Sequence, residues 1–411
     1  MDAELPDVIA LRLARSVESR NARDAWPDIP VKAFRAAEEE VARVARAALG
    51  DAPGTATLNT PPGTDARTLG IAAFAGGMGA LLGYWCETGR VAAEPPVRDV
   101  FATHLDHGRR RTARLREALE RVLVPLTERG VEVYVLKGMH TGYRYFPAPG
   151  TRTMGDIDLL VRPDDWDATR AVLEVQGFVE RGDPGQAAKT VWTPPDTGRV
   201  RSLEFLHAEN PWSLDLHRSL DRFPFEGLRT NLGSPAPGDG DVWDEFCRPV
   251  RVLRQPLLFA YLAVHASSHF YSIMQSRLVE LILVARRDLA GRPDVWQALD
   301  QLVARTGTGR FVFPALDLAE RLVPGTIDPL LLEHVTAAAP ARLRRLVRTT
   351  TPASAQRLHP FPGLRERFVW VASCREALAA LTWLARPHRG ETQWRRVRRA
   401  VRRIVRARLP R

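Results

Sequence analysis

Two short segments alternate apolar side chains with acidic or polar ones, and this alternation constrains the fold more than any other feature of the chain. The segment DIDLLV begins at Asp156, so Asp156 and Asp158 share one face of a strand and the apolar residues share the other. The segment SLDLH ends at His217 and places Asp215 and His217 on one face in the same way. Such strands suit a sheet with helices on one side and an open cleft on the other. If the two strands are neighbours, three carboxylates converge in that cleft.

Strand signals are confined to the middle of the chain. Apolar residues at helical spacing predict helices over residues 1–125, and Ala-, Leu- and Arg-rich segments predict further helices over residues 246–385. Residues 126–245 carry short β-rich runs and one strong helix signal, which predict a small α/β core, and residues 386–411 form a separate tail. We therefore expect an α+β fold with a small mixed sheet flanked by N-terminal and C-terminal helical regions.

Within this core, residues 130–138 predict a first strand, DIDLLV predicts a later one, and Pro163 opens a helix after it. Three further runs, KTVWT, RSLEFLHA and SLDLHRS, also predict strands. Residues 209–212 separate the last two runs and suit a hairpin connection. Glu204 in RSLEFLHA is therefore a rival to Asp215 for the third carboxylate, although its strand lacks a clean polar face.

The cysteines and apolar segments indicate where the protein resides. Cys86, Cys247 and Cys374 lie far apart with no CxxC pairing, which argues against a disulfide framework and fits a reducing cytoplasm. The acidic N-terminus has no apolar signal segment. Residues 69–86 have barely the length of a membrane span and are rich in alanine and glycine. We expect a closely packed pair of buried helices there and a cytoplasmic protein; the alternative is membrane contact.

Most of the net positive charge lies in the tail. Residues 386–411 hold eleven arginines and one acid, Glu391, and so carry +10 of the net charge of +11. Their pattern predicts a basic amphipathic helix suited to an acidic partner, RNA or an anionic membrane surface; the alternative is an end that binds nothing specific. Elsewhere arginine is so common that it signals little. The three lysines, Lys32, Lys137 and Lys189, are more informative.

Clustered carboxylates raise each other's pKa unless a cation compensates them. Mg²⁺ binds carboxylate and phosphate oxygens, and two such ions can clamp the attacking and leaving oxygens of an in-line phosphoryl transfer. We therefore expect Asp156 and Asp158 to hold magnesium against a nucleoside triphosphate (NTP), with Asp215 as a further metal ligand or general base. His217 can orient Asp215 or be an ordinary polar strand residue. The alternative for the two aspartates is a solvated acid pair at a strand entrance.

The block VLKGMHTGYRYFPAPGTRTMGDIDLLV, residues 135–161, resembles the motif block of a family of uncharacterised bacterial nucleotidyltransferases of the polymerase-β type. Those proteins show LKG, a tyrosine-bearing helix, an arginine and DIDLLV, followed by a DLH strand that residues 214–217 match here. The paired histidines and the Arg-Leu of the family are matched by His265, His269, Arg277 and Leu278. The resemblance spans residues 80–290 and implies a nucleotidyltransferase core acting on an NTP.

Three residues of this block are candidates for phosphate binding. Lys137 at a strand end can act as a point charge on phosphate, Gly138 permits a close backbone approach, and Arg152 can clamp phosphate with two donors. Their alternatives are a surface lysine, an ordinary turn glycine and an ion-pair partner inside the acidic site. The chain departs from the broader superfamily, which has a Gly-Ser turn where Lys137 and Gly138 stand here. It also has Glu280 in the region where family members carry an aspartate.

Aromatic and histidine pairs near this block are weaker signals. His265 and His269 lie at i, i+4 on one helix face, but no HExxH motif or third ligand accompanies them. They indicate packing or contact with the acceptor substrate rather than zinc. Tyr143 and Tyr145 can stack on a base, and core packing is their alternative role.

These features predict a Mg²⁺-dependent enzyme that transfers a nucleoside monophosphate from an NTP, such as ATP, to an unknown protein or small-molecule acceptor, releasing pyrophosphate. One alternative is a catalytically inactive nucleotidyltransferase-like scaffold whose tail binds RNA or anionic membrane. Another is a glycosyltransferase whose DxD holds a nucleotide sugar, although only one strand clearly precedes DIDLLV. A HAD phosphatase is excluded because Leu160 stands where its motif needs threonine.

Overall fold

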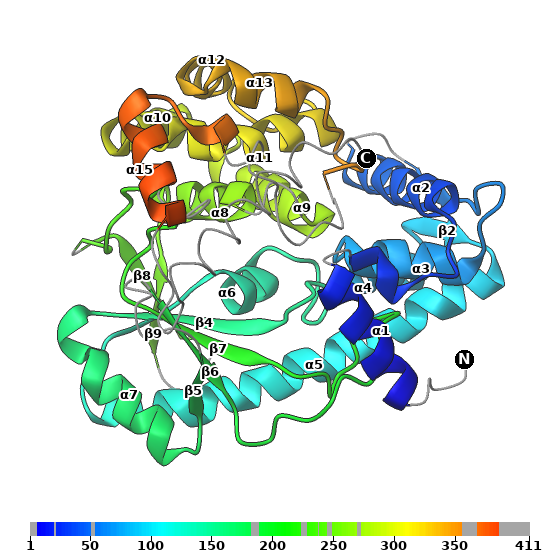
Figure 1. Cartoon of the computed structure of the whole chain (residues 1–411), viewed down its shortest axis with the longest axis horizontal. Coiled ribbons are helices and arrows are strands. Elements are labelled where there is room, and N and C mark those ends of the chain that lie inside the picture. Colours follow the sequence, from blue (N-terminus) through cyan, green and yellow to red (C-terminus); the bar gives the residue numbers. More distant parts are fainter. Residues whose placement is uncertain are drawn as a thin grey trace.

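One long helix, α5 (Pro95–Glu128), lies against both the N-terminal helices and the central sheet in the computed structural model (Figure 1). At about 1.5 Å per residue it is about 50 Å long, which lets it tie the two parts together. The structure describes residues 6–19, 22–50, 54–181, 189–222, 228–236, 238–244, 249–268, 273–355 and 368–385.

The N-terminal region is helical, as the sequence predicts, and contains one small parallel β-ladder that the sequence did not indicate. The ladder joins β1 (Ala56–Leu58) to β2 (Val91–Ala93). The helices are α1 (Pro6–Ser19), η1 (Ala22–Ala25), α2 (Val31–Leu49), α3 (Ala66–Ala75) and α4 (Gly79–Glu87).

The Ala/Gly-rich stretch forms the buried helix pair α3 and α4. A Cβ atom at Gly83 would lie 2.3 Å from the carbonyl oxygen of Phe101 in α5, and one at Gly79 would lie 2.1 Å from Nδ1 of His104. Glycine is therefore required for α4 to approach α5 this closely. Among the described helices none is long and apolar enough to cross a membrane.

A seven-stranded mixed sheet forms the centre, in the order β5-β6-β7-β4-β3-β9-β8. Strands β4 and β7 pair in parallel, and β6 and β3 flank them in antiparallel orientation. The strands and the helices among them are β3 (Val133–Val135), α6 (Lys137–Arg144), β4 (Asp156–Val161), η2 (Pro163–Asp165), α7 (Trp166–Val175), β5 (Val179–Arg181), β6 (Lys189–Thr193), β7 (Ser213–His217), β8 (Gly240–Trp243) and β9 (Val250–Leu253).

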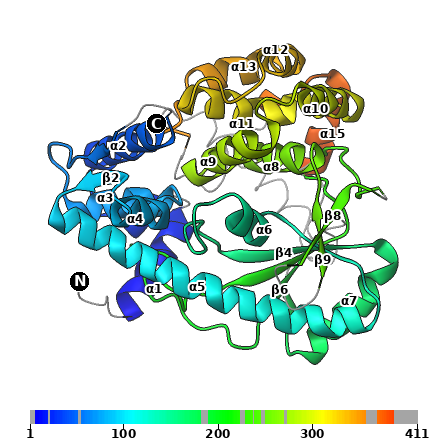
Figure 2. The same ribbon diagram turned by 180° about the vertical axis from the view of Figure 1, so that it is seen from behind.

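The two faces of the sheet have different neighbours. Ile157, Leu159 and Leu214 belong to one apolar cluster with α5 and α7, which lie beneath the sheet in Figures 1 and 2. The opposite face carries the carboxylates and lies toward α6 and the C-terminal helices. It was expected to be an open cleft, but Asp158 is only 3% exposed and Asp215 only 5%. That expectation was wrong, because helices cover this face as well.

The C-terminal helices stack above this second face (Figure 2). Helices α8 and α9 belong to the same apolar cluster as Tyr134 and Leu160 of the sheet, so this layer is packed against the core. The elements are α8 (Leu257–Ser268), α9 (Gln275–Val284), the π-helix η4 (Ala285–Leu289), α10 (Pro293–Thr306), α11 (Gly309–Leu322), α12 (Pro329–Ala338), α13 (Ala341–Arg348), η5 (Phe368–Trp370) and α15 (Cys374–Ala385).

Residues 201–208, expected to be a strand paired with β7, form an irregular segment with bends instead, and β7 pairs with β6. Contacts with helices hold this segment away from the sheet. Glu204 accepts from Nε of Arg67 at 2.5 Å, and the ring of Phe205 lies 4.7 Å from that of His107. The proposed hairpin was therefore wrong, and Glu204 does not lie on a strand.

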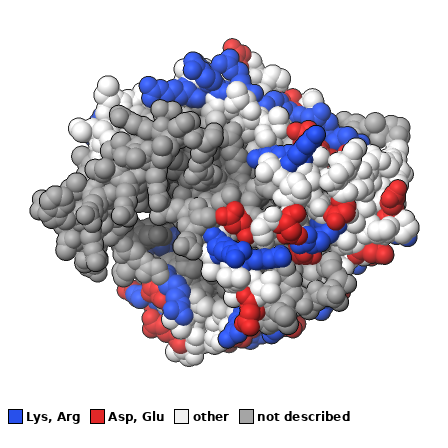
Figure 3. Space-filling view, turned by 45° about the vertical axis from the view of Figure 1, so that its right-hand side comes forward, with Lys and Arg blue, Asp and Glu red and all other residues white. Residues whose placement is uncertain are grey.

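The fold is α+β, with a mixed sheet and helices flanking it, as predicted. The sheet continues to Leu253 in β9, past the expected end of the core at residue 245. The division at residues 125, 245 and 385 otherwise stays a prediction. On the face shown in Figure 3, the described basic and acidic side chains are interspersed. The basic tail, residues 386–411, lies outside the described residues.

Candidate active site

The three predicted carboxylates lie on one face of the sheet where β4 and β7 run side by side. The parallel register pairs Asp158 with Asp215 and Asp156 with Ser213. Because side chains alternate along each strand, Asp156, Asp158 and Asp215 all project from the same face. The strands that the sequence predicted from their alternation are therefore neighbours.

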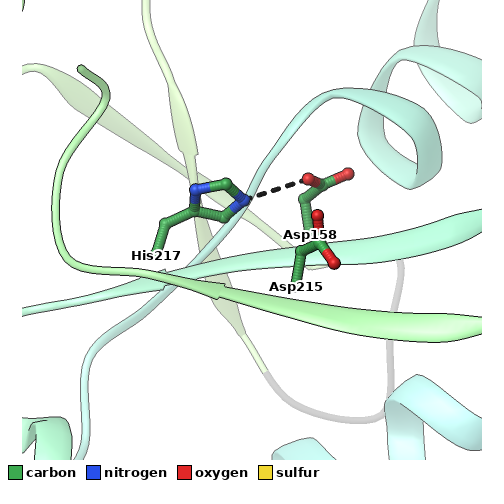
Figure 4. Close-up of side chains that lie close together, drawn as sticks. All are labelled: Asp158, Asp215 and His217. Carbon is green, nitrogen blue, oxygen red and sulfur yellow. Dashed lines mark hydrogen bonds and ion pairs between the residues drawn. The ribbon is translucent and has the colours of Figure 1, made fainter. Parts of the chain in front are cut away.

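Asp158 is the most completely buried of the three. Its Oδ2 atom lies 2.7 Å from Nζ of Lys137, and its Oδ1 atom lies 3.1 Å from Nε2 of His217 (Figure 4). Burial alone would raise the pKa of Asp158, but the charge of Lys137 and the hydrogen bond from His217 hold it below its usual range. Asp158 is therefore a carboxylate with fixed orientation.

His217 contacts Asp158 rather than Asp215, which corrects the expected partner. Burial lowers the pKa of His217 to about 3, so the ring is neutral near pH 7. In a neutral ring only one nitrogen carries a proton, so if Nε2–H donates to Asp158, Nδ1 is unprotonated and can only accept a hydrogen bond. His217 thus fixes the side chain of Asp158 without adding charge.

Asp215 has a different electrostatic environment. Burial, followed by the negative charge of Asp158, raises the pKa of Asp215, and Lys189 opposes this shift through an ion pair with Oδ2. Ligand atoms of Asp158, Asp215 and His217 all lie within 4.8 Å of one another. A carboxylate with a raised pKa at such a cluster is suited to accept a proton.

Asp156 lies at the entrance to the cluster. Its side chain is 39% exposed, and its Oδ2 atom lies 3.6 Å from Nζ of Lys137. Lys137 therefore stands between Asp156 and Asp158 and is itself only 6% exposed. The alternative of a solvated surface lysine is excluded by this burial.

Lys137 and Gly138 form the turn from β3 into α6. Lys137 has φ +20°, an unusual value for a residue with a side chain, and Leu136 N–H donates to the carbonyl of Asp158 at 3.0 Å. A Cβ atom at Gly138 would lie 3.3 Å from Nη1 of Arg152. Glycine at this position therefore admits the Arg152 side chain beside the turn.

Arg152 has a protein partner, as its ion-pair alternative anticipated. It donates through Nε to Oε1 of Glu280 at 2.8 Å and through Nη2 to Oε2 at 3.1 Å. Thr141 of α6 also donates to Glu280. Glu280, which stands in the region where the family carries an aspartate, thus joins α9 to α6 and Arg152.

Several residues around the carboxylates were not selected from the sequence. Lys189 forms an ion pair with Asp215. Because the chain has only three lysines, the residue type itself was a sequence signal that could have singled out Lys189. Arg111 of α5 donates to the carbonyls of Met154 at 2.6 Å and Asn210 at 2.7 Å, close to the starts of β4 and β7. No sequence signal distinguished Arg111 from the other arginines.

The aromatic and histidine candidates lie outside the carboxylate cluster. Tyr145 donates to Asp288 at 2.6 Å, and the ring of Tyr143 lies 6.1 Å from that of Trp243. His265 is buried in α8, and His269 lies outside the described residues. The described part of the chain offers one cluster that could hold a metal, and it contains neither of these two histidines.

The carboxylate cluster fits a hard divalent cation. Oxygen atoms of Asp158 and Asp215 approach each other within 4.8 Å, and Asp156 adds a partly exposed carboxylate. The ammonium groups of Lys137 and Lys189 contact these oxygens, so positive charge already stabilises this position. His217 is less suited as a ligand, because Nε2 is engaged with Asp158.

The known proteins to which this chain is similar are nucleotidyltransferases. A sequence profile of the family described as "Uncharacterised nucleotidyltransferase" matches residues 62–324. No curated protein matches the chain. Among solved structures, MenT4, a nucleotidyltransferase toxin from Mycobacterium tuberculosis H37Rv, is similar with 16% identity and a TM-score of 0.31, covering 69% of this chain and 97% of that one.

Proposed function

The chain belongs to this family of uncharacterised nucleotidyltransferases, and we propose that it transfers a nucleoside monophosphate from an NTP to an acceptor hydroxyl or similar nucleophile, with Mg²⁺ bound by Asp156 and Asp158 and with Asp215 as the general base. The observation that carries this proposal is the parallel register that aligns Asp158 with Asp215 on one sheet face. Family membership supports the reaction class, and the register supports the choice of these carboxylates as its site.

The residues divide the work according to their environments. Asp158 is ionised and held by Lys137 and His217, so it suits a permanent metal ligand. Asp156, which is partly exposed, can complete the site toward the substrate. A divalent cation bound there would neutralise the triphosphate and polarise its phosphorus–oxygen bonds.

Asp215 is proposed as the base. It takes the proton from the acceptor oxygen as that oxygen forms a bond to the α-phosphorus, while the bond from the α-phosphorus to the bridging oxygen breaks and pyrophosphate leaves. The raised pKa of Asp215 favours this proton transfer. Lys189, paired with Asp215, favours its ionised form, which is the form that can accept the proton.

The glycine turn and Arg152 are proposed to shape the site. Gly138 allows Arg152 to lie beside the start of α6, and Arg152 is held by Glu280. We assign Arg152 to positioning this turn rather than to clamping phosphate, because its Nε and Nη2 atoms already donate to Glu280. Lys137 is proposed to bind the phosphates of the NTP together with the metal ion.

The direct test is to incubate the protein with each α-labelled NTP and Mg²⁺ in cell extract, and to measure both pyrophosphate and labelled product. Transfer of label by the wild type, but not by Asp158→Asn, is the expected result. Absence of pyrophosphate and label with every NTP would overturn the proposal and favour the inactive scaffold. The labelled species would identify the acceptor class.

A further inference from the structure

Two arginines near the carboxylates have buried guanidinium nitrogens without hydrogen-bond partners. Nη1 of Arg277 and Nε of Arg222 are enclosed, and neither finds an acceptor among the residues that the structure describes. Leaving a buried donor unpaired is costly, more so when it is charged, so native proteins keep few of them. Two such groups beside one acidic cluster call for a functional explanation.

Arg277 lies on the face of α9 that is turned toward the site. It precedes Glu280 by three residues, so the two side chains share a helix face. Glu280 reaches Arg152 and also Thr141 in the middle of α6, which places this face against that helix. The charge of Asp156 acts on Arg277, although burial lowers the pKa of Arg277 to about 10.

Arg222 follows β7 and lies against α8. Its Nη2 donates to the hydroxyl of Tyr261, and its guanidinium carbon lies 5.2 Å from the centre of the Tyr261 ring. The charges of Asp158 and Asp215 both act on Arg222. One edge of the guanidinium is thus fixed by Tyr261 while Nε stays unpaired.

The other cations at the site are already engaged. Lys137 contacts Asp158 at 2.7 Å, Lys189 contacts Asp215, and Arg152 is paired with Glu280. Among the described arginines and lysines around the carboxylates, the unpaired donors therefore belong to Arg222 and Arg277. Arginine presents several fixed N–H groups whose geometry matches phosphate oxygens, and it stays charged when buried.

We infer that Arg222 and Arg277 bind the triphosphate of the NTP, so that the phosphates lie between the sheet carboxylates and helices α8 and α9. This rests on the proposed function for the identity of the ligand. It assigns to the C-terminal helices a direct part in substrate binding. The phosphate oxygens supply the acceptors that the two guanidinium groups lack within the described chain.

The test uses inorganic tripolyphosphate with Mg²⁺, which removes any dependence on base preference, and then each NTP in turn. Calorimetric titration compares the full-length wild type with Arg277→Met, Arg222→Met and Arg305→Met. Arg305 is an exposed arginine of α10 and serves as the matched control. We expect each of the first two variants to lose about 10- to 100-fold in affinity for tripolyphosphate, and the control to bind as the wild type does.

A melting curve without ligand separates a binding role from a structural one. Arg277→Met removes a buried guanidinium whose Nη1 has no hydrogen-bond partner among the described residues, so its melting temperature should stay close to that of the wild type while its affinity falls. Arg277→Lys keeps the positive charge but loses the planar set of N–H donors of the guanidinium group, so it should recover only part of the affinity. Arg277→Met carries the test if Arg222→Met fails to fold, because Nη1 of Arg277 has no hydrogen-bond partner among the described residues, whereas Arg222 donates to Tyr261.

The possible outcomes separate the two proposals. If the wild type binds tripolyphosphate and NTP and both variants bind equally tightly, the arginine assignment is overturned while the proposed function stands. If the variants lose affinity but the wild type never transfers label, the phosphate site is supported and the proposed function fails. If the wild type binds neither probe, both are overturned.

Discussion

Nζ of Lys137 lies 2.7 Å from Oδ2 of Asp158, and both side chains are almost completely buried. Lys137 follows β3 and Asp158 lies within β4, so the pair joins two adjacent strands at the centre of the sheet. A buried ion pair of this kind is strongly destabilising when one partner is lost, because the other charge is left uncompensated. Lys137 and Asp158 therefore stabilise the fold and also belong to the proposed metal site.

Stability should fall at low pH as Asp158 becomes protonated. Its pKa is lowered in the folded state from an ordinary value of 3.8, so its ionised form stabilises the fold above that value. This contribution should be lost progressively as the pH falls below 3.8 toward the folded pKa. Urea unfolding of the wild type and Asp158→Asn at pH 7 and pH 3 measures it: the difference in unfolding free energy should shrink at pH 3. An unchanged difference would contradict the depressed pKa.

Lys137→Met should destabilise the protein by about 3–5 kcal/mol at pH 7, because it leaves the Asp158 charge buried without its main partner. Adding Asp158→Leu to this variant removes the orphaned charge and should restore much of the loss. Urea unfolding of the two single variants and the double variant gives the coupling energy. Additive effects would show that the contact does not stabilise the fold.

Asp158→Asn should abolish Mg²⁺-dependent binding of NTP in a protein that still folds, since the metal loses a fixed carboxylate ligand. Nucleotide affinity measured with and without Mg²⁺, beside a melting curve, tests this. A folded variant that keeps the full Mg²⁺-dependent gain in affinity would remove Asp158 from the metal site.

The alternation in DIDLLV and SLDLH was sufficient to predict the carboxylate face, because the side-chain period of a strand is two and leaves only one way to bury the apolar residues. Helix boundaries were also readable, as in α5, where the apolar periodicity ends near Gly130. The prediction of a strand over residues 201–208 was wrong because a β-rich run does not show which distant residues will contact it. The ion pair of Glu204 with Arg67, 137 positions away, leaves no local signal.

Other parts of the site depend on contacts that no local pattern encodes. Lys189 reaches Asp215 because β6 pairs with β7 in antiparallel register, with Lys189 opposite His217. Arg111 lies 43 residues before Met154, whose carbonyl it binds. Because the chain is rich in arginine, the residue type alone could not identify Arg111 as structurally important. Its role becomes visible only from the packing of α5 under the sheet.

Arg111→Met should destabilise the protein by about 3 kcal/mol or more. Arg111 is 2% exposed and also donates to the carbonyls of Gly155 at 3.3 Å and Pro211 at 3.0 Å, so its loss leaves several buried carbonyls unpaired at about 1–3 kcal/mol each. Arg121→Met, at an exposed position on the same helix, is the control and should change stability little. Equal effects of the two substitutions in urea unfolding would argue against Arg111 fixing the starts of β4 and β7.

Asp215→Ala should reduce turnover by about 10²- to 10⁴-fold while changing NTP affinity much less. Asp156 and Asp158 would bind the metal that accompanies the triphosphate, so their loss should appear in affinity. The proposed contact of Asp215 is with the attacking oxygen, and it strengthens in the transition state, so its loss should lower kcat more than it raises KM.

Glu204→Ala is the matched control for Asp215→Ala, because Glu204 was the rival carboxylate and is bound to Arg67 among the N-terminal helices. It should keep most of the activity. Steady-state rates of labelled transfer at saturating and limiting NTP give kcat and KM for both variants. If Glu204→Ala is inactive and Asp215→Ala is near the wild type, the base has been assigned to the wrong carboxylate. If neither substitution changes turnover, the acceptor is activated by a group other than these acids, and the raised pKa of Asp215 reflects only its burial beside Asp158.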